Sequence, residues 1–314
     1  MASTGTRLGW RSRLVAVGPL ALAGGVAGAA QGVAQETATC FGEPATITGS
    51  GTINGTSGDD VIIGSPSNDA INGLGGDDTI CGLAGGDQIA GGVGNDRIDA
   101  GEGNDFVRGD VVNFAASAVG GGHDVLYLGP GDDNSLGDSV GLIASGGGND
   151  YISGDDGLDG VIGDSIAFAG DATGGGNDVL DGGLGPDFVL GDSEAFVGRA
   201  IAAGNDTVIG SGGDDLGLVG DNLSAGAVTS AGHDAVDGGD GNDRLFGDNV
   251  DTTRSATFGS AGGNDVLDAG DGADFLRAGP RNDFLDGGLG SPDDCDGEAG
   301  TDSASGCEIV AGVP

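Results

Sequence analysis

The feature that most constrains this chain is a nine-residue period that begins soon after Cys40. Aspartate recurs at Asp60, Asp69, Asp78, Asp87, Asp96 and Asp105. Two residues after each aspartate comes an aliphatic side chain: Ile62, Ile71, Ile80, Ile89, Ile98 and Val107. One such unit cannot bury its aliphatic residue, whereas stacked units bury a continuous column. The period therefore predicts stacked β-structure, although 73 glycines and 8 prolines without a period would indicate disorder.

From about residue 106 the repeat lengthens, and successive aspartate pairs stand 26 to 31 residues apart. An insert opening with Gly-Asp lies between the pairs, at Asp110, Asp138, Asp164, Asp192, Asp221 and Asp248. Several inserts carry a phenylalanine near their middle, at Phe114, Phe168, Phe196 and Phe258. We expect 18-residue coils that widen to about 28 residues, with the insert as a third strand packed through its phenylalanine. The alternative is that the inserts protrude as loops. Leu218 arrives one residue late in its repeat, which predicts a bulge.

Taken alternately, nineteen aspartates form two ladders, each stacked along one edge of the coils. Ladder one is Asp60, Asp78, Asp96, Asp124, Asp150, Asp178, Asp206, Asp234, Asp265 and Asp283. Ladder two is Asp69, Asp87, Asp105, Asp133, Asp159, Asp187, Asp215, Asp243 and Asp274. Parallel strands are about 4.8 Å apart. At that distance two carboxylates repel by about 3–4 kcal/mol at an effective dielectric of 20.

Few basic residues are present to relieve this repulsion, because 50 Asp and Glu face only 10 Lys and Arg, and the net charge is −40. Ca²⁺ accepts six to eight oxygen ligands in flexible geometry, and Mg²⁺ is stricter, so calcium between adjacent turns fits best. The alternative is that these aspartates only form turns. The Gly-Asp series from Asp110 to Asp248 is either a third set of ligands or a set of turn caps. The negative charge also excludes binding to nucleic acid or to an anionic membrane surface.

The segments around Asp78 and Asp96, Gly-Leu-Gly-Gly-Asp-Asp-Thr-Ile-Cys and Gly-Gly-Val-Gly-Asn-Asp-Arg-Ile-Asp, resemble the nonapeptide repeat of RTX, or haemolysin-type, calcium-binding proteins. The resemblance implies a right-handed parallel β-roll. It also implies that calcium is held between successive turns by the turn aspartate and by glycine carbonyls, so the two ladders are the expected ligands. Two sites look weaker, because the turn before Asp69 lacks glycines and Arg281 stands beside Asp283.

The N-terminus resembles a secretory signal. Arg7, Arg11 and Arg13 precede an apolar run with small residues at the candidate cleavage points, after Ala29, Ala30 or Ala34. A membrane anchor is the alternative, although the run is short and weakly apolar. Export would place the four cysteines in an oxidising compartment. Three pairings are open to them, and Cys40–Cys81 with Cys295–Cys307 is the most economical.

The predicted organisation is a signal peptide at 1–34, an N-terminal cap at 35–50, a nonapeptide β-roll at 51–108, an extended-repeat solenoid at 109–287 and a C-terminal disulfide cap at 288–314.

No catalytic constellation stands out in the sequence. His123 and His233 occupy slots that hold asparagine in sister repeats, so we interpret them as turn residues. Gly-Asp-Ser at Ser139 matches a nucleophile-elbow pattern and the start of GDSL-type esterases, but it recurs within the repeat frame, which explains it better. The sequence thus predicts a secreted, non-enzymatic protein that binds Ca²⁺ and folds as calcium fills its turns. The rival is an extracellular structural or adhesive surface protein in which calcium serves only to hold the fold.

Overall fold

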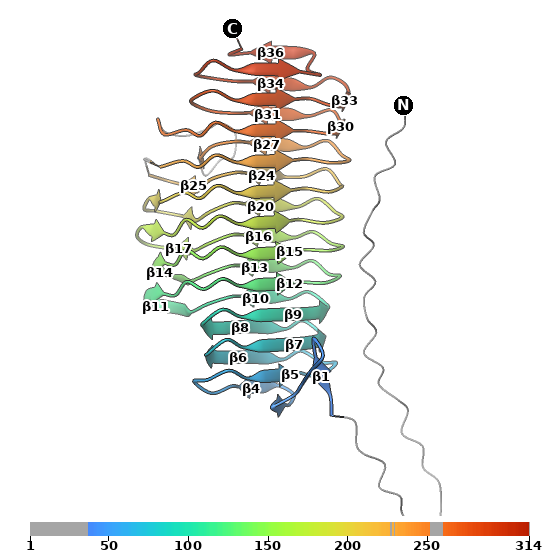
Figure 1. The fold of residues 1–314 in the computed structure, drawn as a ribbon, viewed down its shortest axis with the longest axis vertical. Helices are drawn as coiled ribbons and strands as arrows, with labels where there is room; N and C mark the ends of the chain where they lie inside the picture. The colour runs from blue at the N-terminus through green and yellow to red at the C-terminus, as the bar shows by residue number, and fades with distance from the viewer. Residues whose placement is uncertain (1–36, 227, 229, 252–259, 314) are drawn as a thin grey trace, which may run out of the picture. The chain divides into compact units, whose positions relative to one another are not determined.

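A computed structural model describes residues 37–226, 228, 230–251 and 260–313. The predicted signal segment and Phe258 lie outside these residues. The described chain is all-β and contains no helix, and its coils stack one upon another from β4 to β36 (Figure 1). All strand pairs are parallel except the β1–β2 hairpin. The predicted parallel solenoid is therefore confirmed.

Two twelve-stranded sheets run the length of the stack, and each ladder aspartate directly precedes a strand of one of them, except Asp215, which Leu216 separates from β24. Sheet I follows ladder one and contains β3 (Ile47–Thr48), β5 (Val61–Ile63), β7 (Thr79–Ala84), β9 (Arg97–Glu102), β12 (Val125–Tyr127), β15 (Tyr151–Ser153), β19 (Val179–Asp181), β23 (Thr207–Ile209), β26 (Ala235–Asp237), β29 (Val266–Asp268), β32 (Phe284–Asp286) and β35 (Ser303–Ser305). Sheet II follows ladder two and contains β4 (Thr52–Asn54), β6 (Ala70–Gly75), β8 (Gln88–Val93), β10 (Phe106–Arg108), β13 (Asn134–Leu136), β16 (Gly160–Ile162), β20 (Phe188–Leu190), β24 (Gly217–Val219), β27 (Arg244–Phe246), β31 (Phe275–Arg277), β34 (Asp294–Asp296) and β36 (Ile309–Ala311).

The inserts form a third parallel sheet, so the third-strand interpretation is confirmed over the loop alternative. Sheet III contains β11 (Val112–Val119), β14 (Val140–Ser145), β17 (Ile166–Ala167), β18 (Ala172–Thr173), β21 (Glu194–Ala195), β22 (Ala200–Ile201), β25 (Leu223–Ser224) and β28 (Val250–Asp251). Four short strands lie outside these sheets: β1 (Thr39–Cys40), β2 (Glu43–Pro44), β30 (Asp271–Gly272) and β33 (Leu289–Gly290). We call the first coils, residues 47–108, which have no insert, the narrow section, and residues 109–251 the wide section.

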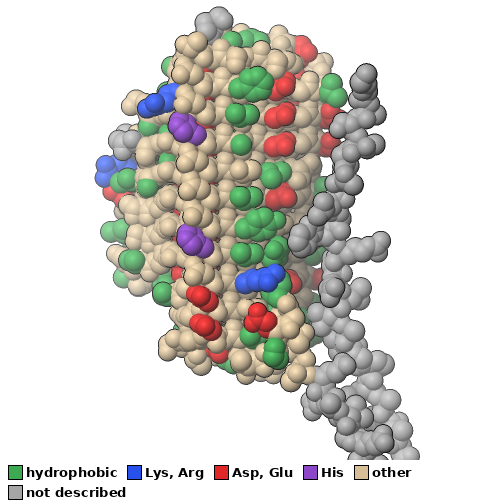
Figure 2. Space-filling model, viewed as in Figure 1, with side chains coloured by type: hydrophobic (Ala, Val, Ile, Leu, Met, Phe, Trp, Pro, Cys, Tyr) green, Lys and Arg blue, Asp and Glu red, His purple; other side chains and the backbone are tan. Residues whose placement is uncertain are grey.

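The main core lies between sheets I and II, where nearly every strand contributes one inward aliphatic residue. Ser135 in β13 and Cys295 in β34 take that position in their strands. Ile62, Ile80 and Ile98 pair in register on sheet I, and all three are completely buried. The same register along every coil stacks side chains of one kind in columns on the surface as well (Figure 2). The period of the sequence therefore sets the register directly, because a slip of one residue would turn the whole column outward.

The wide section has a second core between sheets II and III. This core contains Leu190 and Phe246 from sheet II and Val140 and Val250 from sheet III. Buried alanines, among them Ala167, form a third cluster inside the insert layer. In the wide section sheet II is thus covered on both faces, which is typical of parallel sheets.

The prediction that the insert strands pack through their phenylalanines is wrong. Phe114, Phe168 and Phe196 are 59%, 41% and 46% exposed and lie in a row on the outside of sheet III. Their rings contact one another, with centroids 6.0 Å apart for Phe114 and Phe168 and 5.4 Å apart for Phe168 and Phe196. Aliphatic and alanine side chains, and not these rings, fill the space beneath the third sheet.

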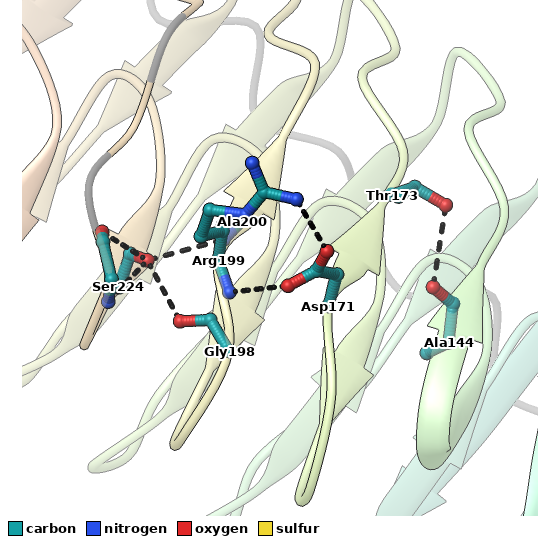
Figure 3. A network of polar contacts seen from close by, with 8 residues as sticks. Ala144, Asp171, Thr173, Gly198, Arg199, Ala200 and Ser224 are labelled. Atoms are coloured by element: carbon teal, nitrogen blue, oxygen red, sulfur yellow. Dashed lines mark hydrogen bonds and ion pairs between the residues drawn. The ribbon is translucent and has the colours of Figure 1, made fainter.

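Polar contacts between coils tie the outer edge of sheet III (Figure 3). The Arg199 guanidinium lies 2.8 Å from the Asp171 carboxylate of the preceding coil, and the Arg199 amide donates to the same group. The Ser224 hydroxyl accepts a hydrogen bond from the Ala200 amide at 3.1 Å. The hydrogen bond from the guanidinium lowers the pKa of Asp171, which is half-buried.

The late arrival of Leu218 is absorbed before its strand. Asp187 and Asp215 keep their ladder contact, while Phe188 pairs with Gly217 and Val189 with Leu218. One extra residue therefore lies between Asp215 and Gly217, and the core column continues unbroken.

Both ends carry a disulfide, in the pairing that the sequence favoured. Cys40 is bonded to Cys81, which ties the β1–β2 hairpin to β7, and Cys295 is bonded to Cys307 across the last coils. Across the part of the chain that the structure describes, no helix is both long and apolar enough to cross a lipid bilayer.

Candidate metal centre

The ladder aspartates are buried and linked coil to coil. Each backbone amide donates to Oδ1 of the ladder aspartate in the next coil, for example from Asp78 to Asp96 at 2.8 Å and from Asp178 to Asp206 at 2.8 Å. The link is kept when the spacing changes from 18 to 28 residues, as between Asp96 and Asp124 at 2.6 Å. The structure thus brings the predicted residues into two continuous rows, one at the start of each main sheet.

The second carboxylate oxygen, Oδ2, faces no donor in most of the ladder. In ladder one this buried, unpartnered oxygen belongs to Asp78, Asp96, Asp124, Asp150, Asp178, Asp206, Asp234, Asp265 and Asp283. In ladder two it belongs to Asp87, Asp105, Asp133, Asp159, Asp187, Asp215, Asp243 and Asp274. A buried carboxylate oxygen without a partner is strongly unfavourable, so a repeated row of them indicates a missing positive charge.

The first coil is different, because protein groups already occupy Oδ2 there. Asp60 accepts from the Thr56 amide at 2.7 Å and from the Thr56 hydroxyl at 2.9 Å. Asp69 accepts from the Ser65 amide at 2.6 Å, in the turn that lacks glycines. A cation would therefore stabilise these two aspartates less than the other ladder members.

Glycine leaves room for oxygens to converge on each Oδ2. A Cβ atom at Gly73 would collide with Asp78 Oδ2 and with the carbonyl oxygen of Gly91 in the next coil. At Gly137 the colliding atoms are Asp150 Oδ2 and the carbonyl oxygen of Gly163. Any side chain here would fill a space that carboxylate and carbonyl oxygens share. Such a set of hard oxygen donors is the kind that Ca²⁺ prefers.

Burial and neighbouring carboxylates raise the ladder pKa values. Burial raises the pKa of Asp78 to about 6 and that of Asp187 to about 6. Burial raises the pKa of Asp178 to about 10, and repulsion from the Asp164 and Asp206 carboxylates adds to the rise. The negative form of each group is therefore disfavoured until a positive charge is added.

The Gly-Asp series of the inserts lies completely buried beside ladder one. Asp138 Oδ2 accepts from the Gly148 amide at 3.2 Å, and Asp164 Oδ2 accepts from the Gly176 amide at 3.3 Å. One oxygen of each group thus caps the turn that leads to the next ladder-one aspartate, which agrees with the turn-cap interpretation. The serine after it forms a ladder of its own, because the Ser139 amide donates to the Ser165 hydroxyl at 3.3 Å.

The ladders extend further than the sequence analysis placed them. The Asp283 amide donates to Asp302 Oδ1 and the Asp274 amide to Asp293 Oδ1, both at 3.0 Å. Both added aspartates are buried and have an unpartnered Oδ2. The signal was present, since Cys295 and Ala304 follow them by two residues, but the 19-residue spacing breaks the period. Arg281, the cation expected to weaken the site at Asp283, is exposed.

The profile of the RTX calcium-binding nonapeptide repeat matches residues 47–80, 82–113, 119–139, 172–193, 202–217, 227–253 and 260–292. The chain belongs to this family. RTX repeats bind Ca²⁺, and the buried aspartate clusters with their carbonyl neighbours fit calcium. A search of curated proteins finds no match.

The remaining sequence motifs fit the RTX frame. His123 Nδ1 accepts from the Asn149 amide and His233 Nδ1 from the Asn264 amide, each at 2.7 Å, as asparagine oxygens do in sister coils. Ser139 is completely buried, and its hydroxyl lies 3.4 Å from the Gly120 carbonyl oxygen. A nucleophile in this position could not meet a substrate.

Proposed function

We propose that this chain is an exported calcium-binding RTX solenoid whose folding is driven by Ca²⁺. The observation that carries the proposal is the double row of buried Oδ2 atoms that face no donor. Stacking the coils without cations would bury like charges against one another. Calcium converts that repulsion into attraction, so binding energy becomes folding energy.

The proposed ligands are the ladder aspartates through Oδ2, together with glycine carbonyls of the neighbouring coil. Asp293 and Asp302 join the predicted ladders, and Asp60 and Asp69 contribute least because their oxygens have donors. Each ion would lie between two coils, so filling one site orders two turns. At a calcium concentration 100 times the dissociation constant, one such site adds about 2.7 kcal/mol to stability.

Export and the absence of catalysis belong to the same proposal. Both disulfides suit an oxidising compartment, and the N-terminal sequence has the organisation of a secretory signal. The buried position of Ser139 argues against the esterase alternative. Ca²⁺ is the partner that the chemistry supports, and the net charge of −40 disfavours nucleic acid.

Circular dichroism of the chain from residue 35 onward tests the folding claim. In EDTA at pH 8 we expect a largely unfolded spectrum, and millimolar Ca²⁺ should restore the β-signal cooperatively. A β-spectrum of equal strength in EDTA would overturn the calcium-driven folding, whatever the binding affinity.

A matched pair of variants tests the ligands. Asp214 and Asp215 are adjacent, but Asp214 is exposed and hydrogen-bonded to Asn242, whereas Asp215 is a ladder-two member. Asp215→Asn should raise the calcium concentration needed for folding by about tenfold, which corresponds to about 1.4 kcal/mol. Asp214→Asn should leave it unchanged, because Asn242 already fills the same slot in the next coil. Equal curves for both variants would remove the ladder from the binding site.

A further inference from the structure

Two insert aspartates, Asp138 and Asp164, use only one carboxylate oxygen each as a turn cap. Asp138 and Asp164 give Oδ2 to glycine amides, and their Oδ1 atoms face no hydrogen-bond donor. Both side chains are completely buried. A turn cap needs one acceptor oxygen, so the cap alone does not account for the second buried oxygen.

The carboxylates of these insert aspartates lie close to those of ladder one. Asp110, Asp124 and Asp138 each offer one carboxylate oxygen, and the three atoms lie within 4.8 Å of one another. Asp138, Asp150 and Asp164 form a second group of the same kind. Asp138 belongs to both groups, so five carboxylates form one continuous buried cluster across successive coils.

The backbone adds neutral oxygens to both groups. A Cβ at Gly109 would collide with Asp124 Oδ2 and with the carbonyl oxygen of Gly137. A Cβ at Gly137 would collide with Asp150 Oδ2 and the carbonyl oxygen of Gly163. Three carboxylates and at least one carbonyl therefore surround each point, which is a donor set suited to a hard divalent cation.

The row does not offer such a group at every coil. Asp221 accepts from the Gly232 amide through Oδ1 and from the Asn249 side chain through Oδ2, so both of its oxygens have donors. Ladder two has no insert row beside it at all, because its turns remain short. Among the residues that the structure describes, three-carboxylate groups occur only in the first coils of the wide section.

We propose that Asp110–Asp124–Asp138 and Asp138–Asp150–Asp164 bind two Ca²⁺ ions of a second class, bridged by Asp138. These sites rest on the proposed function, since Asp124 and Asp150 are also ladder members. They differ from the ordinary turn sites in having an additional carboxylate and in being enclosed by sheet III. Because more charged ligands raise calcium affinity, they should fill first.

Calcium content of the chain from residue 35 onward tests this, measured by equilibrium dialysis across buffered free Ca²⁺ followed by atomic emission. Asp138→Asn keeps an acceptor for the Gly148 amide and removes the shared charge. It should lose about two equivalents of the tightest calcium, since two groups share this residue. Asp110→Asn belongs to one group and should lose about one. Asp171→Asn, at a half-buried insert aspartate that pairs with Arg199, is the control and should lose none.

The outcomes separate this proposal from the broader one. A full calcium complement in folded Asp138→Asn would overturn it and assign the insert row to turn capping alone. Asp159→Asn in ladder two should still lose calcium in that case, so the proposed function would stand. If no variant changes calcium content and the parent chain binds none, both proposals fail. Should Asp138→Asn not fold in saturating calcium, Asp110→Asn decides the question by its single equivalent.

Discussion

The narrow and wide sections share the same two ladders, but the third sheet changes ladder one more than ladder two. On ladder one, burial raises the pKa of Asp78 to about 6 in the narrow section and that of Asp124 to about 10 in the wide section, where the Asp150 carboxylate adds to the rise. On ladder two the rise is smaller: burial raises the pKa of Asp87 to about 6 in the narrow section, and in the wide section that of Asp187 to about 6 and that of Asp215 to about 8.

The position of the insert explains the difference. It replaces the turn that leads into ladder one, whereas the short turn into ladder two is kept throughout the wide section. The added strand and its aspartates therefore enclose one row of carboxylates and leave the other at an ordinary turn. A solenoid can thus vary its sites edge by edge without disturbing its period.

The largest expected effect is on pH dependence without calcium. A carboxyl whose pKa is raised in the folded chain favours folding below its unfolded pKa of about 3.9 and loses that contribution as pH rises through its folded value. The cited values run from about 6 at Asp78 to about 10 at Asp124. The calcium-free chain should therefore fold at pH 5 and unfold by pH 8, as followed by circular dichroism.

With saturating calcium the dependence should reverse, because protons then compete with Ca²⁺ for the carboxylates. If the calcium-free chain were more stable at pH 8 than at pH 5, the ladder carboxyls could not be buried with raised pKa values.

Next in size is the loss of the second core, which exists only in the wide section. Phe246 is completely buried between sheets II and III, so Phe246→Ala should cost about 3–5 kcal/mol in calcium-saturated thermal or urea unfolding. Phe168, on the outside of sheet III, is the matched control, and Phe168→Ala should change stability by about 0.5 kcal/mol or less. Equal losses from the two variants would mean that the insert layer packs through its outer rings after all.

A smaller effect is expected from filling the space at a ladder site. The added methyl of Gly137→Ala would meet Asp150 Oδ2 and the Gly163 carbonyl, and should cost about 2–3 kcal/mol of calcium-dependent stability. Gly58 has no atom within 4 Å of the position of an added Cβ, so Gly58→Ala is the control for the loss of glycine itself. If both alanines behave alike in calcium titrations followed by circular dichroism, the space at Gly137 has no role in binding.

The smallest effect compares the two edges within one coil. Burial raises the pKa of Asp178 to about 10 and that of Asp187 to about 6. The cost of burying a charged carboxylate is therefore larger at Asp178, and substitution by Asn removes more of it there. Asp178→Asn should move the pH midpoint of calcium-free folding upward by about 0.2 unit, because several protons bind together. Asp187→Asn should move it less. A larger shift for Asp187→Asn would show that sheet III does not enclose ladder one.

The repeat made most of the fold predictable. Identical spacing of aspartate and aliphatic residues specifies register, so the ladders and the main core could be inferred from the sequence. The disulfide pairing could be inferred separately, as the most economical of the three possible pairings. The direction in which the insert side chains face could not. Phenylalanine at mid-insert suggested a buried ring, but alanines such as Ala167 and aliphatic side chains fill the space beneath the insert strands.

The site shows the same limit. The insert aspartates were found by their spacing, but a spacing does not say whether the carboxylate faces a glycine amide, ladder one or both. Asp293 and Asp302 were missed because a spacing of 19 residues interrupts the period, although their partners two residues later keep the pattern. Close to the ends, local pairing decides the structure more than periodicity does.

The ladder hydrogen bonds all run in one sense, and this gives the stack a direction of growth. In each coil the amide of the ladder aspartate donates a hydrogen bond to the carboxylate of the next coil, as the Asp265 amide does to Asp283. A chain that emerges N-terminus first would add coils one way, each finished part acting as template for the next. The same polarity would permit head-to-tail fibres of separate chains. At one end the Thr46 hydroxyl donates to Asp60, and at the other Glu308 accepts from the Asp293 amide, so the terminal coils act as stops.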